Sequence, residues 1–202
     1  QQLIDRFPGD TTIAEKVAAS LVAEQQFESA LEHYARLVER ARTPESKLSY
    51  QVKVAQMRSK LGQTDRAREQ LQTILNKLRP GSWLHAKVRD QLEQSYLSTG
   101  DFDGLAKYYT ERADHSPDDL DSLIRLGQIL VGADRPLEAE STFRKVLERS
   151  AQNTEARRSL IEILINDDRA GEAVSQFEVL LRDDPANPDL LMRLGEIHLG
   201  NL

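Results

Sequence analysis

A repeat of 34 residues constrains the fold of this chain more than any other feature of its sequence. Similar segments begin at Leu120, Thr154 and Pro188, at intervals of 34 residues, and a fourth begins 34 residues upstream, at Ala86. Each segment places apolar residues three or four positions apart, which is the pattern of an amphipathic helix. A fixed period of this length indicates helical units that bury their apolar faces against neighbouring units.

The pattern continues upstream with small insertions, in segments that begin at Thr11 and Leu48. One apolar position recurs in all six predicted first helices and is expected to face the core. It is occupied by Val17, Val54, Leu92, Leu126, Leu160 and Leu194. A second predicted helix follows each complete first helix, and four of these second helices have an alanine with a large side chain four positions later. The alanines are Ala30, Ala67, Ala139 and Ala173.

Through these features the sequence resembles the tetratricopeptide repeat family. Besides the alanines, the residues that carry the resemblance are Leu126-Gly127, Leu194-Gly195, Pro8, Pro117 and Pro185. The resemblance covers essentially the whole chain and implies an all-α fold, a right-handed α-solenoid of about eleven antiparallel helices. The family's tryptophan early in the first helix is missing. Its places are taken by Ala14, Gln51, Arg89, Leu123, Arg157 and Leu191.

The period divides the chain into one solenoid segment with seven parts. We expect a part-repeat over 1–10, complete repeats over 11–47, 48–85, 86–119, 120–153 and 154–187, and a part-repeat over 188–202. Helix starts follow from capping residues, because Thr43, Ser82 and Asn187 each precede a predicted first helix. Both ends fall inside a repeat, so we expect an excerpt of a longer chain. The unpaired last helix is then expected to expose apolar residues and to promote self-association.

Composition and charge exclude several classes of function. The net charge of −6 disfavours binding to a nucleic-acid backbone, which needs clustered Lys and Arg, and it also disfavours the 35-residue repeats that read nucleic acids. No apolar run approaches the roughly 20 residues of a membrane span, so no membrane insertion is expected. The chain has no cysteine, which removes disulfides and thiol nucleophiles and leaves the compartment open.

No pattern in the sequence indicates catalysis, a cofactor or a metal. None of the four histidines has a second His at the spacing that would aim two ligands at one metal. His115, beside Asp114 and Asp118, is the best candidate, but an acidic turn between two repeats is its ordinary interpretation. The sequence contains no glycine-rich phosphate loop and no nucleophile elbow.

The resemblance implies a binding groove on the concave face, which the first helices line. The groove-facing side chains would be Glu15, Val52, Gln56, Asp90, Gln94, Ile124, Gln128, Arg158, Glu162, Met192 and Glu196. A solvated polar face would contain the same residue types. One subclass of the family grips the carboxylate-ended tails of chaperones with cationic and amide side chains. The matching places in the first three complete repeats contain no cation, so we expect a partner segment of basic or mixed charge, bound without its free C-terminus.

The third repeat departs from the pattern. Glu93 stands where related first helices have alanine or glycine, and Leu105 stands where related second helices have alanine. These large side chains are expected to push helices 82–98 and 101–114 apart. A four-residue extension just ahead contains Trp83, the only tryptophan. The irregularity is either a bend or a partner-contacting ledge, or it is a longer helix whose Trp83 covers a widened gap.

These observations predict a protein–protein interaction scaffold that is not an enzyme. Its partner would be a peptide or a helix of another protein. The alternative is that this segment is the docking or regulatory arm of a larger enzyme whose catalytic domain lies outside the 202 residues. The sequence identifies neither the partner nor the process that the protein serves.

Overall fold

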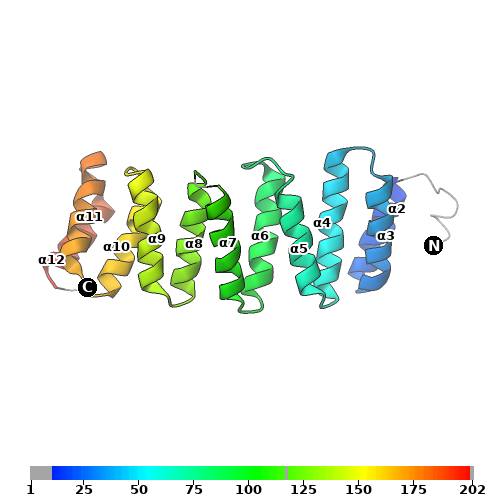
Figure 1. The fold of residues 1–202 in the computed structure, drawn as a ribbon, viewed down its shortest axis with the longest axis horizontal. Helices are drawn as coiled ribbons and strands as arrows, with labels where there is room; N and C mark the ends of the chain where they lie inside the picture. The colour runs from blue at the N-terminus through cyan, green and yellow to red at the C-terminus, as the bar shows by residue number, and fades with distance from the viewer. Residues whose placement is uncertain (1–10, 117, 201–202) are drawn as a thin grey trace. The chain divides into compact units, whose positions relative to one another are not determined.

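The fold is entirely helical over the described residues. The structure, a computed structural model, describes residues 11–116 and 118–200. These ranges contain eleven α-helices and no strand, which confirms the predicted all-α helical repeat solenoid (Figure 1). The predicted part-repeat over 1–10 lies outside the described residues, as does Pro117. No helix in the described part of the chain is long and apolar enough to cross a membrane.

The chain forms two compact units, and the first covers residues 1–100. Its helices are α2 (Thr11–Ala23), α3 (Phe27–Arg40), α4 (Pro44–Lys60), α5 (Thr64–Leu75) and α6 (Trp83–Leu97). Each helix packs on the next one in the sequence. A core cluster forms where α2, α3 and α4 meet; it consists of Ala18, Ala30, Tyr34, Leu37, Val54 and Met57. The alanines allow the helices to approach closely while the larger side chains fill the space between them.

The second unit covers residues 101–202. Its helices are α7 (Phe102–His115), α8 (Leu120–Gly132), α9 (Pro136–Arg149), α10 (Thr154–Asn166), α11 (Ala170–Asp183) and α12 (Pro188–His198). Successive helices again pack on each other, and α8 also contacts α10. We call α2, α4, α6, α8, α10 and α12 the first helices. The others are the second helices. First helices can also contact each other, as α8 and α10 do, and we call the surface that the first helices of a unit share the face formed by the first helices.

Side-chain caps begin the helices where the sequence predicts them. Thr43 and Ser82 accept hydrogen bonds from the backbone N–H groups of Ser46 and His85, at the starts of α4 and α6. Asn187 does the same at α12. The helices α4 and α6 therefore begin ahead of the predicted repeat starts at 48 and 86. The inserted residues lengthen these helices, and the loop over residues 76–82, ahead of α6, is also longer than the other loops between the described helices.

The predicted core position is confirmed in four of the six first helices. Leu92 and Leu160 are completely or almost completely buried, and Val54 and Leu126 are also buried. Val17 and Leu194, in the first and last of the described helices, are half-buried.

Gly127 allows an especially close contact between α8 and α9. A Cβ atom at this position would lie 2.6 Å from two ring atoms of Phe143, which is completely buried. Gly195 holds the corresponding position in α12, 68 residues later, and a Cβ atom there would meet nothing within 4 Å. The same position is therefore tightly packed in α8 and open in α12.

Candidate partner-binding site

A cleft of about 370 Å³ lies in the first unit, on the face formed by the first helices. Its floor consists of apolar side chains from α4 and α5, namely Ala55, Met57, Ala67 and Leu71, all of which are buried. Two of the predicted groove residues, Gln56 of α4 and Gln94 of α6, line it. Gln94 is exposed, and Gln56 is half-buried between the core residues Ala55 and Met57.

The polar lining of this cleft is mostly neutral. Gln91 adds a third carboxamide, and Lys60 is the only charged side chain among the lining residues. The carboxamide oxygen of Gln91 is buried and has no hydrogen-bond partner among the described residues. Carboxamides both donate and accept hydrogen bonds, so they match the alternating N–H and C=O groups of a peptide backbone.

The other predicted groove residues of the first unit differ in their environments. Val52 is only 3% exposed and packs in the core, so its side chain does not face a groove. The Glu15 carboxylate accepts a hydrogen bond from the Tyr50 hydroxyl. Burial, together with this bond to a negative group, raises the pKa of Tyr50 to about 12. Asp90 is exposed, with an oxygen 3.6 Å from the Arg89 guanidinium.

In the second unit, most of the predicted groove side chains are exposed and some bridge neighbouring first helices. Gln128 of α8 donates a hydrogen bond of 2.9 Å to Glu155 of α10. Glu162 of α10 accepts one of 2.9 Å from Arg193 of α12. Ile124 is buried. The remaining three, which are at least partly exposed, are Arg158, Met192 and Glu196.

The predicted ledge is not brought together as one site within either unit. Trp83 is 72% exposed at the start of α6, with the Lys87 ammonium 5.8 Å from its ring centre, so it does not cover a gap. Glu93 is half-buried in the first unit, and Leu105 is buried in the second. The predicted separation of the helices that carry Glu93 and Leu105 stays a prediction.

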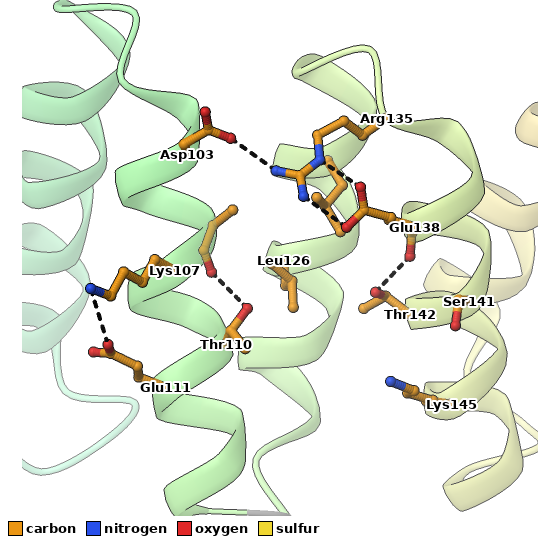
Figure 2. Close-up of a pocket in the computed structure, with 12 residues that line it drawn as sticks. Asp103, Lys107, Thr110, Glu111, Leu126, Arg135, Glu138, Ser141, Thr142 and Lys145 are labelled. Atoms are coloured by element: carbon orange, nitrogen blue, oxygen red, sulfur yellow. Dashed lines mark hydrogen bonds and ion pairs between the residues drawn. The ribbon is translucent and has the colours of Figure 1, made fainter.

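Sequence reasoning missed a second groove, which lies between α7 and α9 in the second unit and has a volume of about 440 Å³. We call it the α7/α9 groove. Leu126 and Leu130 of α8 and Ala106 of α7 form its apolar floor. Figure 2 shows Thr110 of α7 and Thr142 of α9 facing each other across it. Both hydroxyls donate to backbone carbonyls of their own helices, at 2.9 and 2.8 Å.

A cluster of three charged residues closes one end of this groove. The Arg135 guanidinium donates two hydrogen bonds of 2.7 Å to Glu138 and one of 2.9 Å to Asp103, which lies across the groove on α7 (Figure 2). The hydrogen bond with Arg135 lowers the pKa of Glu138. Lys107, Glu111 and Lys145 line the rest of the groove. The sequence signal for the groove was the pair of small residues, Ala106 and Thr110, on one face of α7.

No group of three or more metal-ligating side chains occurs within residues 11–116 and 118–200. The best sequence candidate, His115, donates its Nδ1–H to the backbone carbonyl of Glu111, at 2.6 Å. That bond is an ordinary i to i−4 contact at the end of α7.

The serial packing of antiparallel helices defines an all-α helical repeat protein. Residues 130–192 match the family model of the tetratricopeptide repeat. The resemblance predicted from the sequence is confirmed. A comparison with curated proteins gave no match.

Solved structures with the same fold are tetratricopeptide repeat proteins. One from Parabacteroides merdae has a TM-score of 0.54 and 14% identity, over 94% of this chain and 73% of that one. YrrB, described as a tetratricopeptide repeat protein with an unusual peptide-binding site, has a TM-score of 0.51 and 14% identity, over 95% of both chains. A thermophilic protein from Thermus thermophilus has a TM-score of 0.51 and 18% identity, over 93% of this chain and 98% of that one. At these identities the likeness concerns the fold.

Proposed function

We propose that this chain is a non-catalytic scaffold that binds a peptide or a helix of a partner protein along the face formed by its first helices. The observation that carries the proposal is the cleft of about 370 Å³ in the first unit. Gln56 and Gln94 come from two different first helices and line the same cleft above a buried apolar floor. An apolar floor with a few polar groups is the usual composition of a binding site.

The chemistry of the cleft suits a peptide. An apolar side chain of the partner would lie on Ala55, Ala67 and Leu71, and the carboxamides would hydrogen-bond to the partner's backbone. YrrB supports the proposal to the extent that it shares the fold and is described as having a peptide-binding site. In this chain the bound segment would have basic or mixed charge and no free C-terminus in the cleft.

The charge preference rests on acidic side chains of the same helices. Glu15 on α2 and Asp90 on α6 are exposed. Lys60, within the cleft, is a single cation without a neighbouring arginine or lysine in the lining. A terminal carboxylate needs several donors or positive groups close by, and a single lysine supplies too few. Attraction by exposed acids weakens as salt screens it.

Binding of basic, neutral and acid-ended peptides, measured by fluorescence polarisation at two salt concentrations, tests the proposal. We expect the basic peptides to bind most tightly at low salt. The double substitution Gln56→Ala and Gln94→Ala should weaken this binding by about tenfold, or about 1.4 kcal/mol. Glu69→Ala, on the exposed side of the second helix α5, is the matched control and should leave affinity unchanged. Tightest capture of an acid-ended peptide, or no effect of the double substitution, would refute the proposal.

A further inference from the structure

We propose that the α7/α9 groove is a second binding site, which receives the side chain of an arginine from a partner protein. It lies between second helices and so goes beyond the function proposed for the first-helix face. In the following repeat, the side chains of Glu140 and Arg144 occupy the corresponding place between α9 and α11.

The two grooves share an arginine and a glutamate at the start of one wall helix, and we call this pair the frame. Arg135 and Glu138 begin α9, and Arg169 and Glu172 occupy the same places 34 residues later, at the start of α11. In both pairs the arginine donates two hydrogen bonds to the glutamate, at 2.7 and 2.7 Å in the first and at 2.8 and 2.8 Å in the second. Leu126 and Leu130 of α8 form the floor of the open groove, and Leu160 and Leu164 hold the same places in α10. The frame therefore follows from the repeat.

Of the positions that differ on the wall helix, two determine how much space the groove leaves. In the α9/α11 groove they hold Glu140 and Arg144, one turn apart on α9. In the α7/α9 groove the same positions, 34 residues earlier, hold Ala106 and Thr110. The smaller residues leave the space of about 440 Å³ unfilled. A difference in side-chain volume, with the same backbone frame, explains the open groove.

The filled groove shows that a second arginine can bind beside the glutamate of the frame. Arg144 donates to Glu140 at 2.7 Å and to Glu172 at 3.1 Å. Arg169 donates to Glu140 at 2.7 Å and to Glu172 at 2.8 Å. Two guanidinium groups thus alternate with two carboxylates. The place of Arg144, beside the glutamate of the frame, is the place that a partner's arginine would take in the open groove, beside Glu138.

The charges of the open groove complement one added cation at this end. Asp103 and Glu138 both accept from the same guanidinium, that of Arg135. The end therefore has two carboxylates and one cation. In the filled groove two guanidinium groups share three carboxylates, because Arg169 also lies 3.5 Å from Asp167. Side chains of Asp103 and Glu138 are 90% and 57% exposed, so a partner can reach both. Arginine suits this position because its planar group can donate to two carboxylates at once.

The rest of the groove selects a single arginine on an apolar stem. Leu126 and Leu130 remain 8% and 4% exposed, while the corresponding Leu160 and Leu164 in the filled groove are 1% and 0% exposed. The aliphatic part of an arginine can cover these leucines. Lys145, farther along the groove, repels a second cation and can attract an acidic residue of the same partner segment (Figure 2).

A nuclear magnetic resonance titration with short peptides tests this site. The probe is the capped pentapeptide Gly-Leu-Arg-Leu-Gly, and its matched control contains citrulline, the neutral isostere of arginine. We expect the arginine peptide to shift the methyl signals of Leu126 and Leu130 and to bind about tenfold more tightly than the citrulline peptide. A third peptide with aspartate in place of arginine should bind no better than the citrulline peptide.

Two variants locate the effect. The double substitution Ala106→Glu and Thr110→Arg copies the filled groove and should abolish the methyl shifts. Glu138→Gln changes one exposed charge and should reduce the preference for arginine over citrulline, even if the double variant does not fold. The inference fails if citrulline binds equally well, if aspartate binds better, if the shifts map elsewhere, or if a second copy of the chain covers the groove. The substitutions Gln56→Ala and Gln94→Ala should not alter this titration, which separates this site from the proposed peptide cleft.

Discussion

The α7/α9 groove and the α9/α11 groove differ although the same repeat builds both. Each has an arginine and a glutamate at the start of one wall helix and leucines on its floor. Glu140 and Arg144 fill the second groove, and Ala106 and Thr110 leave the first one open. The repeat therefore specifies the frame of such a groove, while side chains outside the repeat pattern decide whether it stays open.

The two grooves also differ in how their charges contribute to stability. Glu140 is 8% exposed and accepts hydrogen bonds from both Arg144 and Arg169. The hydrogen bond with Arg169 is the main reason that its pKa is lowered. The ion pairs of the open groove lie at the surface, where such pairs contribute little because water and salt screen them. The filled groove is therefore the more stabilising of the two.

The largest expected effect on the free energy of unfolding concerns α8 and α10, the first helices that carry the leucines of the two grooves. These helices differ at one packing position. Gly127 of α8 lies against the buried ring of Phe143, whereas α10 has Ile161 at the corresponding place. Gly127→Ala should lower the free energy of unfolding by about 1 to 3 kcal/mol, because the added methyl group overlaps the ring. Denaturant unfolding followed by circular dichroism measures the change.

Gly195→Ala is the matched control for this prediction. Its added methyl group meets nothing within 4 Å, so only the helix propensity changes. We expect a gain of about 0.5 to 1 kcal/mol. Changes of the same sign in both variants would contradict the packing difference between α8 and α12.

The next effect concerns the network of the filled groove. Glu140→Ala should lower the free energy of unfolding by about 1 to 2 kcal/mol at neutral pH, because Arg144 and Arg169 each lose a carboxylate partner. Glu148→Ala, an exposed position on the same helix, should change it by less than about 0.5 kcal/mol. Equal losses in the two variants would mean that the network adds nothing beyond surface charge.

The same network predicts a dependence on pH. The pKa of Glu140 is lowered in the folded chain from its ordinary value near 4.5, first by the hydrogen bond with Arg169. Its contribution is therefore fully present above pH 4.5 and is lost as the pH falls through the lowered pKa of the folded state. The stability difference between the wild-type chain and Glu140→Gln should shrink below pH 4.5. A difference that stays constant down to about pH 2.5 would contradict this assignment.

The smallest effect concerns the loops that lead into α9 and α11. Asp134 and Asp168 have φ angles of 57° and 56°, in the left-handed region that favours glycine. Replacing either by glycine should raise the free energy of unfolding by about 0.5 kcal/mol. Equal gains would show that the loops do not cause the difference between the grooves.

The opposite substitution, Gly62→Ala, places a side chain at a φ angle of 74° in the loop ahead of α5. It should lower the free energy of unfolding by about 1 kcal/mol.

Several structural features could be predicted from the sequence because they depend on local rules that act within one repeat. The helix starts at α4, α6 and α12 follow from Thr43, Ser82 and Asn187, whose side chains satisfy backbone N–H groups nearby. The core position of the first helices follows from the helix period. The candidate cleft was predicted in part, since Gln56 and Gln94 line it while Val52 and Ile124 are buried.

The sequence by itself therefore determined the helical repeat, the helix starts and the core positions, since spacing and capping act over a few residues. Only the tertiary structure decided which faces stay open. Whether Ala106 leaves a groove depends on Arg135 and Glu138, which lie about 30 residues away in the sequence and meet α7 only after folding. Burial of Val52 and of Ile124 was likewise decided by neighbouring helices. A ligand site of this kind is formed by side chains of several helices, and packing between helices fixes the space that remains among them.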